Sequence, residues 1–262
     1  MRSMQEVEIQ RIDVSDKKRE TLKDYVAEEK DLHLFLNRRF YATIFCTPSN
    51  LKELAVGHLL TEGIIETINE VEKVAIEANV CHIKLLPSFD LDKRLRLQKH
   101  YGRVILSACG NSGVYKPMRG LPKIKQGSAV KADIVLSCVS QLNSSGEIFK
   151  RTGGVHAAAV FKTNGSCLSF AEDIGRHNAV DKALGMMRLR EIDPADCLLT
   201  LTGRLTGDIV AKSARTKVPI VASIAAAIDS GIMLAKKTNL TLIGFVRRNR
   251  MNIYSCPERI LS

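Results

Sequence analysis

The sequence lacks tryptophan, and Phe, Tyr and Trp together make up only 5% of its 262 residues. Proteins that bind single-stranded nucleic acid stack its bases on aromatic side chains, so this composition does not favour such a protein. No apolar run approaches the roughly 20 residues of a transmembrane helix, and the first residues are charged rather than an apolar signal region. The sequence therefore predicts a cytoplasmic protein without a membrane anchor.

Paired cysteines are also missing, because the seven cysteines lie singly and none has Cys-x-x-Cys spacing. This pattern predicts a reducing compartment, in which most free cysteines are small buried hydrophobic residues. It also argues against a zinc deaminase built on His156, which would need His-x-Glu followed by Pro-Cys-x-x-Cys. Ala158 stands where that glutamate should be. We therefore expect no metal site.

Acidic residues are fewer than basic ones, with 28 Asp and Glu against 39 Lys and Arg and a formal charge of +11. The basic excess favours an anionic partner, which could be nucleic acid, a phosphorylated cofactor or an acidic protein face. Composition alone does not indicate which of these three classes the partner belongs to. No helix-turn-helix, zinc knuckle or aromatic platform supports nucleic acid, so we expect no nucleic-acid partner.

Hydrophobic residues, at 45%, are numerous enough for a substantial core. In the first half of the chain, the pattern predicts two hairpins and one helix, at residues 31–46, 72–86 and 51–61. In the second half, helical stretches separate three apolar strands at 197–202, 219–223 and 240–245. Strands that alternate with helices predict right-handed βαβ crossovers and a mostly parallel sheet.

Polar and basic loops follow these three strands. Gly203, Arg204 and Gly207 lie between the first strand and a helix, where free N–H groups suit a phosphate. Basic residues at 247–250 follow the third strand. Ligands of open α/β sheets gather beyond the carboxyl ends of the strands, so we expect the loops to converge on an anionic ligand.

The stretch from Glu172 to Lys182 is dense in functional groups and includes Arg176 and His177. It lies at a predicted helix start, so Asp173 either caps the helix or belongs to a binding site with His177.

Cys109 differs from the other cysteines because it lies on a glycine-rich loop, between Ser107 and Gly113, directly after a strand-like run. An exposed thiol with basic neighbours favours the nucleophilic thiolate. From these residues alone, a reactive and a structural Cys109 are both open.

Five segments together resemble the formate dehydrogenase accessory family of FdhD/NarQ-type sulfurtransferases. They extend over nearly the whole chain in the family's order, at residues 54–65, 107–113, 152–159, 172–182 and 240–254. The resemblance implies a small N-terminal α+β domain over residues 1–115 and a cytidine-deaminase-like three-layer α/β domain over residues 116–262.

The resemblance also implies a function. Cys109 would accept sulfur from a cysteine desulfurase as a persulfide and pass it to the molybdenum bis(guanine dinucleotide) pterin cofactor, for insertion into the catalytic subunit of formate dehydrogenase. The cofactor would be held as cargo, and a homodimer is expected. The stretch that matches the family's cofactor-binding segment comprises Phe245, Val246, Arg247, Arg248, Asn249 and Arg250.

One residue departs from the family pattern. The family's usual Cys-Gly-x-Cys-Gly motif has Ser112 in place of its second cysteine here. Cys109 would therefore act as a single-thiol carrier. The alternative is a chaperone that binds the cofactor without sulfur chemistry.

Overall fold

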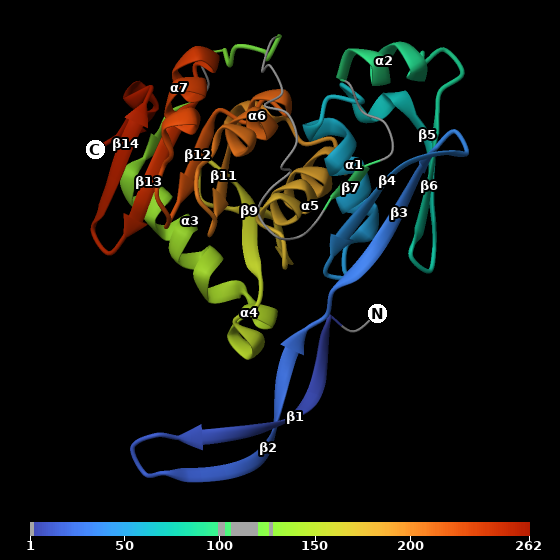
Figure 1. The fold of residues 1–262 in the computed structure, drawn as a ribbon. Coiled ribbons are helices and arrows are strands. Elements are labelled where there is room, and N and C mark those ends of the chain that lie inside the picture. The colour runs from blue at the N-terminus through green and yellow to red at the C-terminus, as the bar shows by residue number, and fades with distance from the viewer. Residues whose placement is uncertain (1–2, 99–102, 106–119, 126–127) are drawn as a thin grey trace.

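The computed structural model describes residues 3–98, 103–105, 120–125 and 128–262. These residues form a six-stranded sheet, a five-stranded sheet and a separate two-stranded arm, with helices packed on and between the two larger sheets (Figure 1). Among them, no helix is both long enough and apolar enough to cross a membrane.

The six-stranded sheet belongs to the second half of the chain. Its order is β10 (Cys167–Asp173), β9 (His156–Lys162), β11 (Cys197–Leu201), β12 (Ile220–Ser223), β13 (Thr241–Arg247) and β14 (Arg250–Ser255). Of the neighbouring pairs in this sheet, only β11–β12 and β12–β13 are parallel, and the other three pairs are antiparallel, so the expected mostly parallel sheet is wrong. The pairs β9–β10 and β13–β14 are antiparallel because short turns connect them, which parallel strands cannot accommodate.

Helices cover both faces of this sheet. The helix α3 (Ala132–Ser145) lies on one face, and α5 (Arg176–Leu189), α6 (Gly207–Arg215) and α7 (Asp229–Thr238) lie on the other. Side chains alternate along β9, so that Phe161 packs towards α3 and Val160 towards α5. The predicted three-layer arrangement is thus present. The short helix α4 (Glu147–Thr152) follows α3.

The five-stranded sheet has the order β5 (Val71–Glu77), β6 (Val80–Leu85), β3 (Lys30–Leu36), β4 (Arg39–Cys46) and β7 (Arg103–Ile105). The helix α1 (Leu51–Thr61) packs on it, and α2 (Leu91–Gln98) follows β6. Both predicted hairpins and the predicted helix are confirmed. The remaining short elements are η1 (Ile68–Glu70), η2 (Pro194–Asp196), η3 (Pro257–Arg259), β8 (Val130–Lys131) and β15 (Ile260–Leu261).

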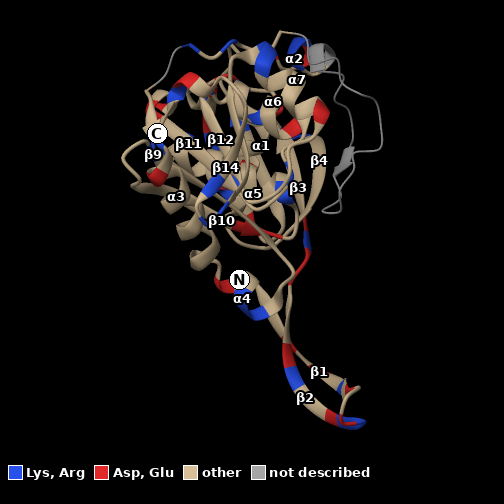
Figure 2. Cartoon of the chain, turned by 90° about the vertical axis from the view of Figure 1, so that its left-hand side faces the viewer, with Lys and Arg blue, Asp and Glu red and all other residues tan. Residues whose placement is uncertain are grey.

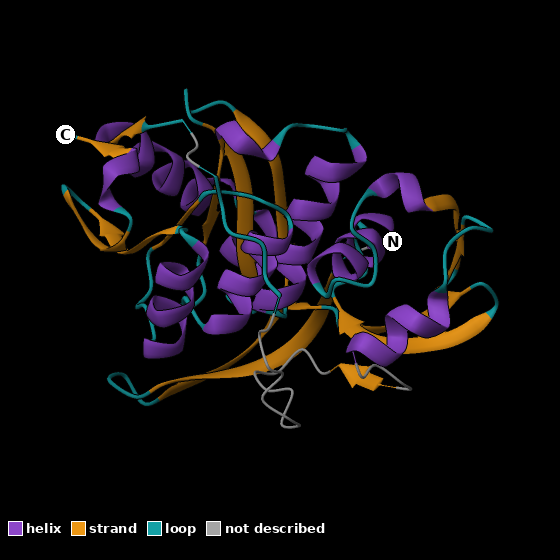
Figure 3. Cartoon of the chain, turned by 90° about the horizontal axis from the view of Figure 1, so that it is seen from above, coloured by secondary structure: helices purple, strands orange, loops and turns teal. Residues whose placement is uncertain are grey.

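Two glycines lie where α1 of the first half of the chain packs against α5 of the second half. Figure 3 shows helices gathered at the centre of the molecule. A Cβ atom on Gly57 would lie 1.8 Å from the carbonyl oxygen of Asp181, and one on Gly185 would lie 2.0 Å from that of Glu53. The two helix backbones therefore touch directly. Only glycine allows so close an approach, because any side chain would force the helices apart.

The predicted division of the chain at residues 115 and 116 lies outside the described residues. It stays a prediction, as does the likeness of the second half to a cytidine deaminase.

A two-stranded arm precedes both sheets. Strand β1 (Met4–Asp13) pairs with β2 (Lys18–Ala27) in an antiparallel register that matches Ile9 with Leu22. Figures 1 and 2 both show the arm projecting away from the rest of the molecule. Residues 7–14 alternate in the way that is typical of a strand, which predicts β1, whereas β2 was not predicted.

Candidate functional site

The loops that follow β11, β12 and β13 meet at the carboxyl edge of the six-stranded sheet. The backbone N–H of Leu205 donates to the carbonyl of Ala226, at 3.0 Å, and that of Phe245 to the carbonyl of Ala225, also at 3.0 Å. The Ser223 hydroxyl donates to the carbonyl of Gly203, at 2.7 Å. The middle loop is thus bonded to the loop after β11 and to Phe245 near the end of β13, so the structure brings these segments together, while the anionic ligand stays a prediction.

Arg176 reaches the same edge from the start of α5. A Cβ atom on Gly203 would lie 3.0 Å from the Cβ of Arg176 and 3.1 Å from its Cδ. The glycine therefore lets the Arg176 side chain lie directly over the loop. His156 is also present, with its Nδ1 3.3 Å from the hydroxyl of Thr202. Burial, and then the charge of Arg176, lower the pKa of His156, so its ring is neutral at neutral pH.

Exposed guanidinium groups give this edge its charge. Arg204, Arg247, Arg248 and Arg250 are all exposed, and among the described residues none of them pairs with a carboxylate. The side chain of Arg247 lies 5.4 Å from the centre of the Phe245 ring. Phe245 itself has a φ of 51°, a left-handed conformation that costs energy in a bulky residue. The arrangement suits an anionic ligand with several phosphates.

Two of the predicted ligand residues have other roles. Val246 is 1% exposed and packs in the core between the sheet and α3, so its side chain does not face a ligand. The N–H of Gly207 donates to the Ser230 hydroxyl, at 3.3 Å, and is not free for a phosphate. Asn249 lies exposed in the turn before β14. The sequence pattern did not reveal these differences because the predicted third strand ended at residue 245, whereas β13 continues to Arg247, and because Ser230 lies 23 positions from Gly207.

His177 is not a cation at this edge. Burial, followed by the positive charges of Lys212 and Arg176, lowers its pKa to about 4. Its Nε2 atom is buried and has no hydrogen-bond partner among the described residues. A neutral imidazole adds no charge toward a phosphate.

The rest of the segment from Glu172 to Lys182 is largely structural. Lys182 Nζ lies 2.7 Å from Asp173 Oδ2 with both side chains fully buried, and it donates to the carbonyl of Thr47 at 2.9 Å. The other oxygen of Asp173 accepts from the Gly175 N–H, at 2.8 Å, and from Asn178 Nδ2, at 3.0 Å. Asp173 thus fixes the start of α5 to the segment after β4, and Gly175, not Asp173, is the N-cap residue.

A second buried network lies beside the glycine crossing. Lys212 Nζ contacts both carboxylate oxygens of Asp181, at 2.8 and 2.9 Å, and the Thr61 hydroxyl donates to the same carboxylate at 2.7 Å. His58 Nδ1 lies 3.4 Å from Asp181. The sequence reasoning missed Lys212. Its one signal was a lysine on the apolar face of α6, among Ile209, Val210 and Ala211.

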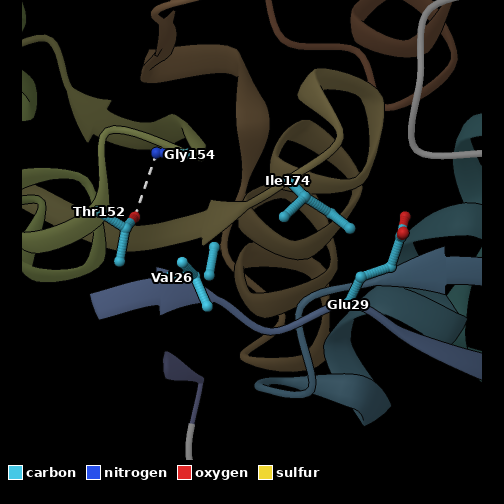
Figure 4. A pocket seen from close by; sticks show the side chains of 6 residues that line it. Val26, Glu29, Thr152, Gly154 and Ile174 are labelled. Carbon is cyan, nitrogen blue, oxygen red and sulfur yellow. Dashed lines mark hydrogen bonds between the residues drawn. The ribbon is translucent and has the colours of Figure 1, made fainter. Parts of the chain in front are cut away.

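A pocket of about 380 Å³ opens between the arm and the sheet edge (Figure 4). Val26 and Ala27 of the arm line it together with Glu29, Thr152, Gly154 and Ile174. The Thr152 hydroxyl accepts from the Gly154 N–H, at 3.1 Å. None of the predicted site residues lines this pocket.

Cys109 and Ser112 lie outside the described residues. The other six cysteines all have raised pKa values, and burial is the first cause in each. The pKa rises to about 12 for Cys46, Cys81 and Cys138, and to about 11 for Cys197. Within the described part of the chain, no three His, Cys, Asp or Glu side chains are grouped to hold a metal ion.

Comparisons with known proteins match this chain over almost its whole length. Proteins named "Sulfur carrier protein FdhD" include one from Picrophilus torridus, 38% identical over 256 residues, and one from Sulfurisphaera tokodaii, 35% identical over 243 residues. The aligned parts cover 93% and 91% of this chain, and 94% and 92% of those proteins.

A solved structure and a family model support the same similarity as these relatives. A crystal structure described as a formate dehydrogenase accessory protein, from Desulfotalea psychrophila, superimposes with a TM-score of 0.82 at 26% identity. The match covers 99% of this chain and 100% of that one. The model of the FdhD/NarQ family matches residues 27–261. This chain therefore belongs to the FdhD/NarQ family.

Proposed function

We propose that this chain carries sulfur for the maturation of formate dehydrogenase. In this proposal a cysteine desulfurase in the cytoplasm supplies the sulfur, Cys109 holds it as a persulfide, and the acceptor is the molybdenum bis(guanine dinucleotide) cofactor destined for the enzyme's catalytic subunit. Membership of the family, together with the names of relatives that match over nine-tenths of the chain, supports the role.

Sulfur transfer needs a thiolate that a partner can reach. The Cys109 thiolate would attack the outer sulfur of the desulfurase persulfide, and the desulfurase thiolate would leave. The raised pKa values of the six described cysteines keep their thiols protonated at neutral pH. Cys109 is the remaining cysteine of the chain, and its glycine-rich surroundings favour access.

The cargo would bind at the carboxyl edge of the six-stranded sheet. The observation that carries this assignment is the set of four exposed guanidinium groups without carboxylate partners in the described structure, beside loops that hydrogen bonds hold together. A bis(guanine dinucleotide) cofactor brings two pyrophosphates, which guanidinium groups bind in a bidentate manner. Arg176 lies over Gly203 at the same edge, and Phe245 offers a ring beside Arg247.

The proposal that Cys109 carries the sulfur is tested by measuring a change in mass. We expect that incubation with a cysteine desulfurase and cysteine adds one sulfur atom to Cys109 and that a reductant removes it. Mass spectrometry of the peptide containing Cys109 measures the gain. Cys167 is the matched control, because it is exposed but its pKa is raised. An unchanged Cys109 peptide, with sulfur on another cysteine, would overturn the assignment.

The cargo site is tested with GDP as the probe. Each charged hydrogen bond contributes about 1.5–3 kcal/mol, so Arg247→Ala and Arg250→Ala are each expected to weaken GDP binding about tenfold or more. Calorimetric titration measures the affinity. Lys237→Ala is the control, because Lys237 is exposed at the end of α7, before β13 begins at the other edge of the sheet. Equal affinities for all four proteins would place the cargo elsewhere.

Ser112 supports a second candidate function. A chain without a second cysteine in this motif could hold the cofactor and deliver it without sulfur chemistry. Such a chaperone would bind GDP as above, but would acquire no sulfur on Cys109. The mass measurement therefore separates the two functions.

A further inference from the structure

His156 lies at the carboxyl edge of the six-stranded sheet, but the proposed function gives it no role. It is the first residue of β9, and the loop after β11 lies beside it, because the N–H of Thr202 donates to the carbonyl of Ala157 at 3.0 Å. Gly203, over which the Arg176 side chain lies, follows Thr202 directly. The half-buried His156 therefore belongs to the same part of the edge as Arg176.

The hydrogen bonds of Thr202 determine which ring nitrogen of His156 carries the proton. The Thr202 hydroxyl oxygen accepts from the N–H of Ala157 at 3.1 Å, so the hydroxyl proton is left to be donated. Among the described residues it has two acceptors, His156 Nδ1 at 3.3 Å and the carbonyl of Ala157 at 3.5 Å. The carbonyl already accepts the Thr202 N–H, so the nearer Nδ1 takes the hydroxyl proton. In a neutral ring the proton of the imidazole then lies on Nε2.

Asp173 lies across from His156 in the register of β9 and β10 but does not pair with its ring. One carboxylate oxygen of Asp173 lies 2.7 Å from Lys182 Nζ, and the other accepts from the N–H of Gly175 at 2.8 Å. Burial and then the charge of Arg176 lower the pKa of His156, while the charge of Asp173 raises it and is the smallest of the three causes. The ring is therefore an uncharged donor at neutral pH.

An uncharged donor is suited to this position. A second cation beside Arg176 would be repelled by it, whereas a neutral N–H adds a hydrogen bond to a phosphate oxygen without that repulsion. Nε2 of His156 has no partner among the described residues, and unlike Nε2 of His177 it is not a buried unpartnered atom. It is therefore accessible to a ligand at the edge where the exposed guanidinium groups lie.

We propose that His156 donates its uncharged Nε2–H to a phosphate oxygen of the guanine-dinucleotide cargo, and that Thr202 holds the ring in the tautomer that makes this possible. The inference rests on the proposed cargo site. His156 contacts the ligand, whereas Thr202 is a positioning residue that acts through His156. Because the donor is neutral, its contribution to binding does not change with pH in the neutral range.

The tautomer is tested by nitrogen NMR on the full chain, because protonated and bare ring nitrogens have separate chemical shifts. We expect a protonated Nε2 and a bare Nδ1 in His156 at neutral pH, with the signals identified by their loss in His156→Gln. Thr202→Ser keeps the hydroxyl and should keep this tautomer, whereas Thr202→Val should give a mixture of both. A proton on Nδ1 in the wild type, or a tautomer that Thr202→Val leaves unchanged, would overturn the proposal.

The contact with the cargo is tested with GDP-mannose, whose pyrophosphate diester keeps its charge in the neutral range. His156→Leu is expected to weaken binding about fivefold to tenfold, because it removes the donor. His156→Gln keeps an N–H and should stay within about threefold of the wild type. Wild-type affinity should change less than about twofold between about pH 6 and pH 8, because a neutral donor gains no proton on binding. Calorimetric titration measures the affinities, and urea unfolding verifies that each variant is folded.

His82→Leu is the matched control, because His82 is exposed on β6 of the other sheet and should not affect binding. Full affinity of His156→Leu, or wild-type affinity that rises several-fold as the pH falls, would overturn the proposal. If Arg247→Ala weakens binding and His156→Leu does not, the cargo site stands and only the role of His156 fails. A wild-type chain that does not bind GDP-mannose would reject the cargo site itself, whereas the mass of the Cys109 peptide tests sulfur transfer independently.

Discussion

Cys109→Ala is expected to abolish formate dehydrogenase activity in cells that depend on this chain, because a carrier without its thiol has nowhere to hold the sulfur. We expect complete loss because the motif contains only one cysteine. Ser112 has a hydroxyl, which forms no persulfide, so no neighbouring residue of the motif can take over. The readout is formate oxidation in extracts of a strain that has this chain as its only copy, with the level of the chain measured by immunoblot.

Cys167→Ser is the matched control, since Cys167 is exposed, yet burial raises the pKa of its thiol. We expect this variant to retain full activity. Full activity of Cys109→Ala would instead favour the chaperone function, provided that GDP binding is unchanged. Loss of activity together with loss of the protein from the extract would point to folding, which the immunoblot detects.

Asp181→Ala is expected to lower the free energy of unfolding by about 3–5 kcal/mol, because it leaves the buried ammonium of Lys212 without its main partner. Asp181 is 1% exposed and Lys212 is 4% exposed, so water cannot replace the carboxylate. Urea unfolding followed by circular dichroism measures the loss. The variant Asp181→Leu/Lys212→Met, which removes both charges, should recover part of it.

The control is an ion pair of similar length at the surface. Arg39 Nη1 lies 2.6 Å from Asp92 Oδ1, but both side chains are about half exposed, so Arg39→Ala should cost at most about 1 kcal/mol. Equal costs for Asp181→Ala and Arg39→Ala would show that the buried network contributes no more than a surface pair.

The contribution of the buried Asp181–Lys212 pair to the free energy of unfolding depends on pH. Burial alone would raise the pKa of Asp181, but Lys212 and His58 hold it below the usual value. The contribution of Asp181 is therefore complete above about pH 4 and is lost as the pH falls through its lowered pKa. Burial alone would lower the pKa of Lys212, but Asp181 and Glu62 raise it, so its contribution is lost only in strong alkali.

The sequence predicted the features that depend on neighbours along the chain. The hairpins, the α1 helix and the three apolar strands are all present, because each has its own pattern of burial and turn residues. The meeting of the loops near Gly203 and Phe245 could be predicted as well, because parallel strands end at the same edge. Antiparallel β14 was missed, since its residues alternate weakly and its first residue, Arg250, was assigned to the basic loop at residues 247–250.

Contacts between distant segments could not be predicted in this way. The carboxylate of Asp181 is 31 positions from Lys212 and 120 positions from Thr61, so no local pattern reveals that they share a buried site. For the same reason, the sequence pattern allowed Asp173 the role of a helix cap. Its partner Thr47 is 126 positions away, and only the packing of α5 against the end of β4 brings them together.

The glycine crossing determines how parts of this chain could be exchanged with those of a relative. In a chimera that joins the first half of one protein to the second half of another, one half supplies position 57 and the other position 185. Each Cβ would meet a backbone oxygen of the opposite helix, at 1.8 and 2.0 Å, so adjusting side chains cannot make room for it. Only halves that bring glycine to both positions can therefore be combined into a folded hybrid.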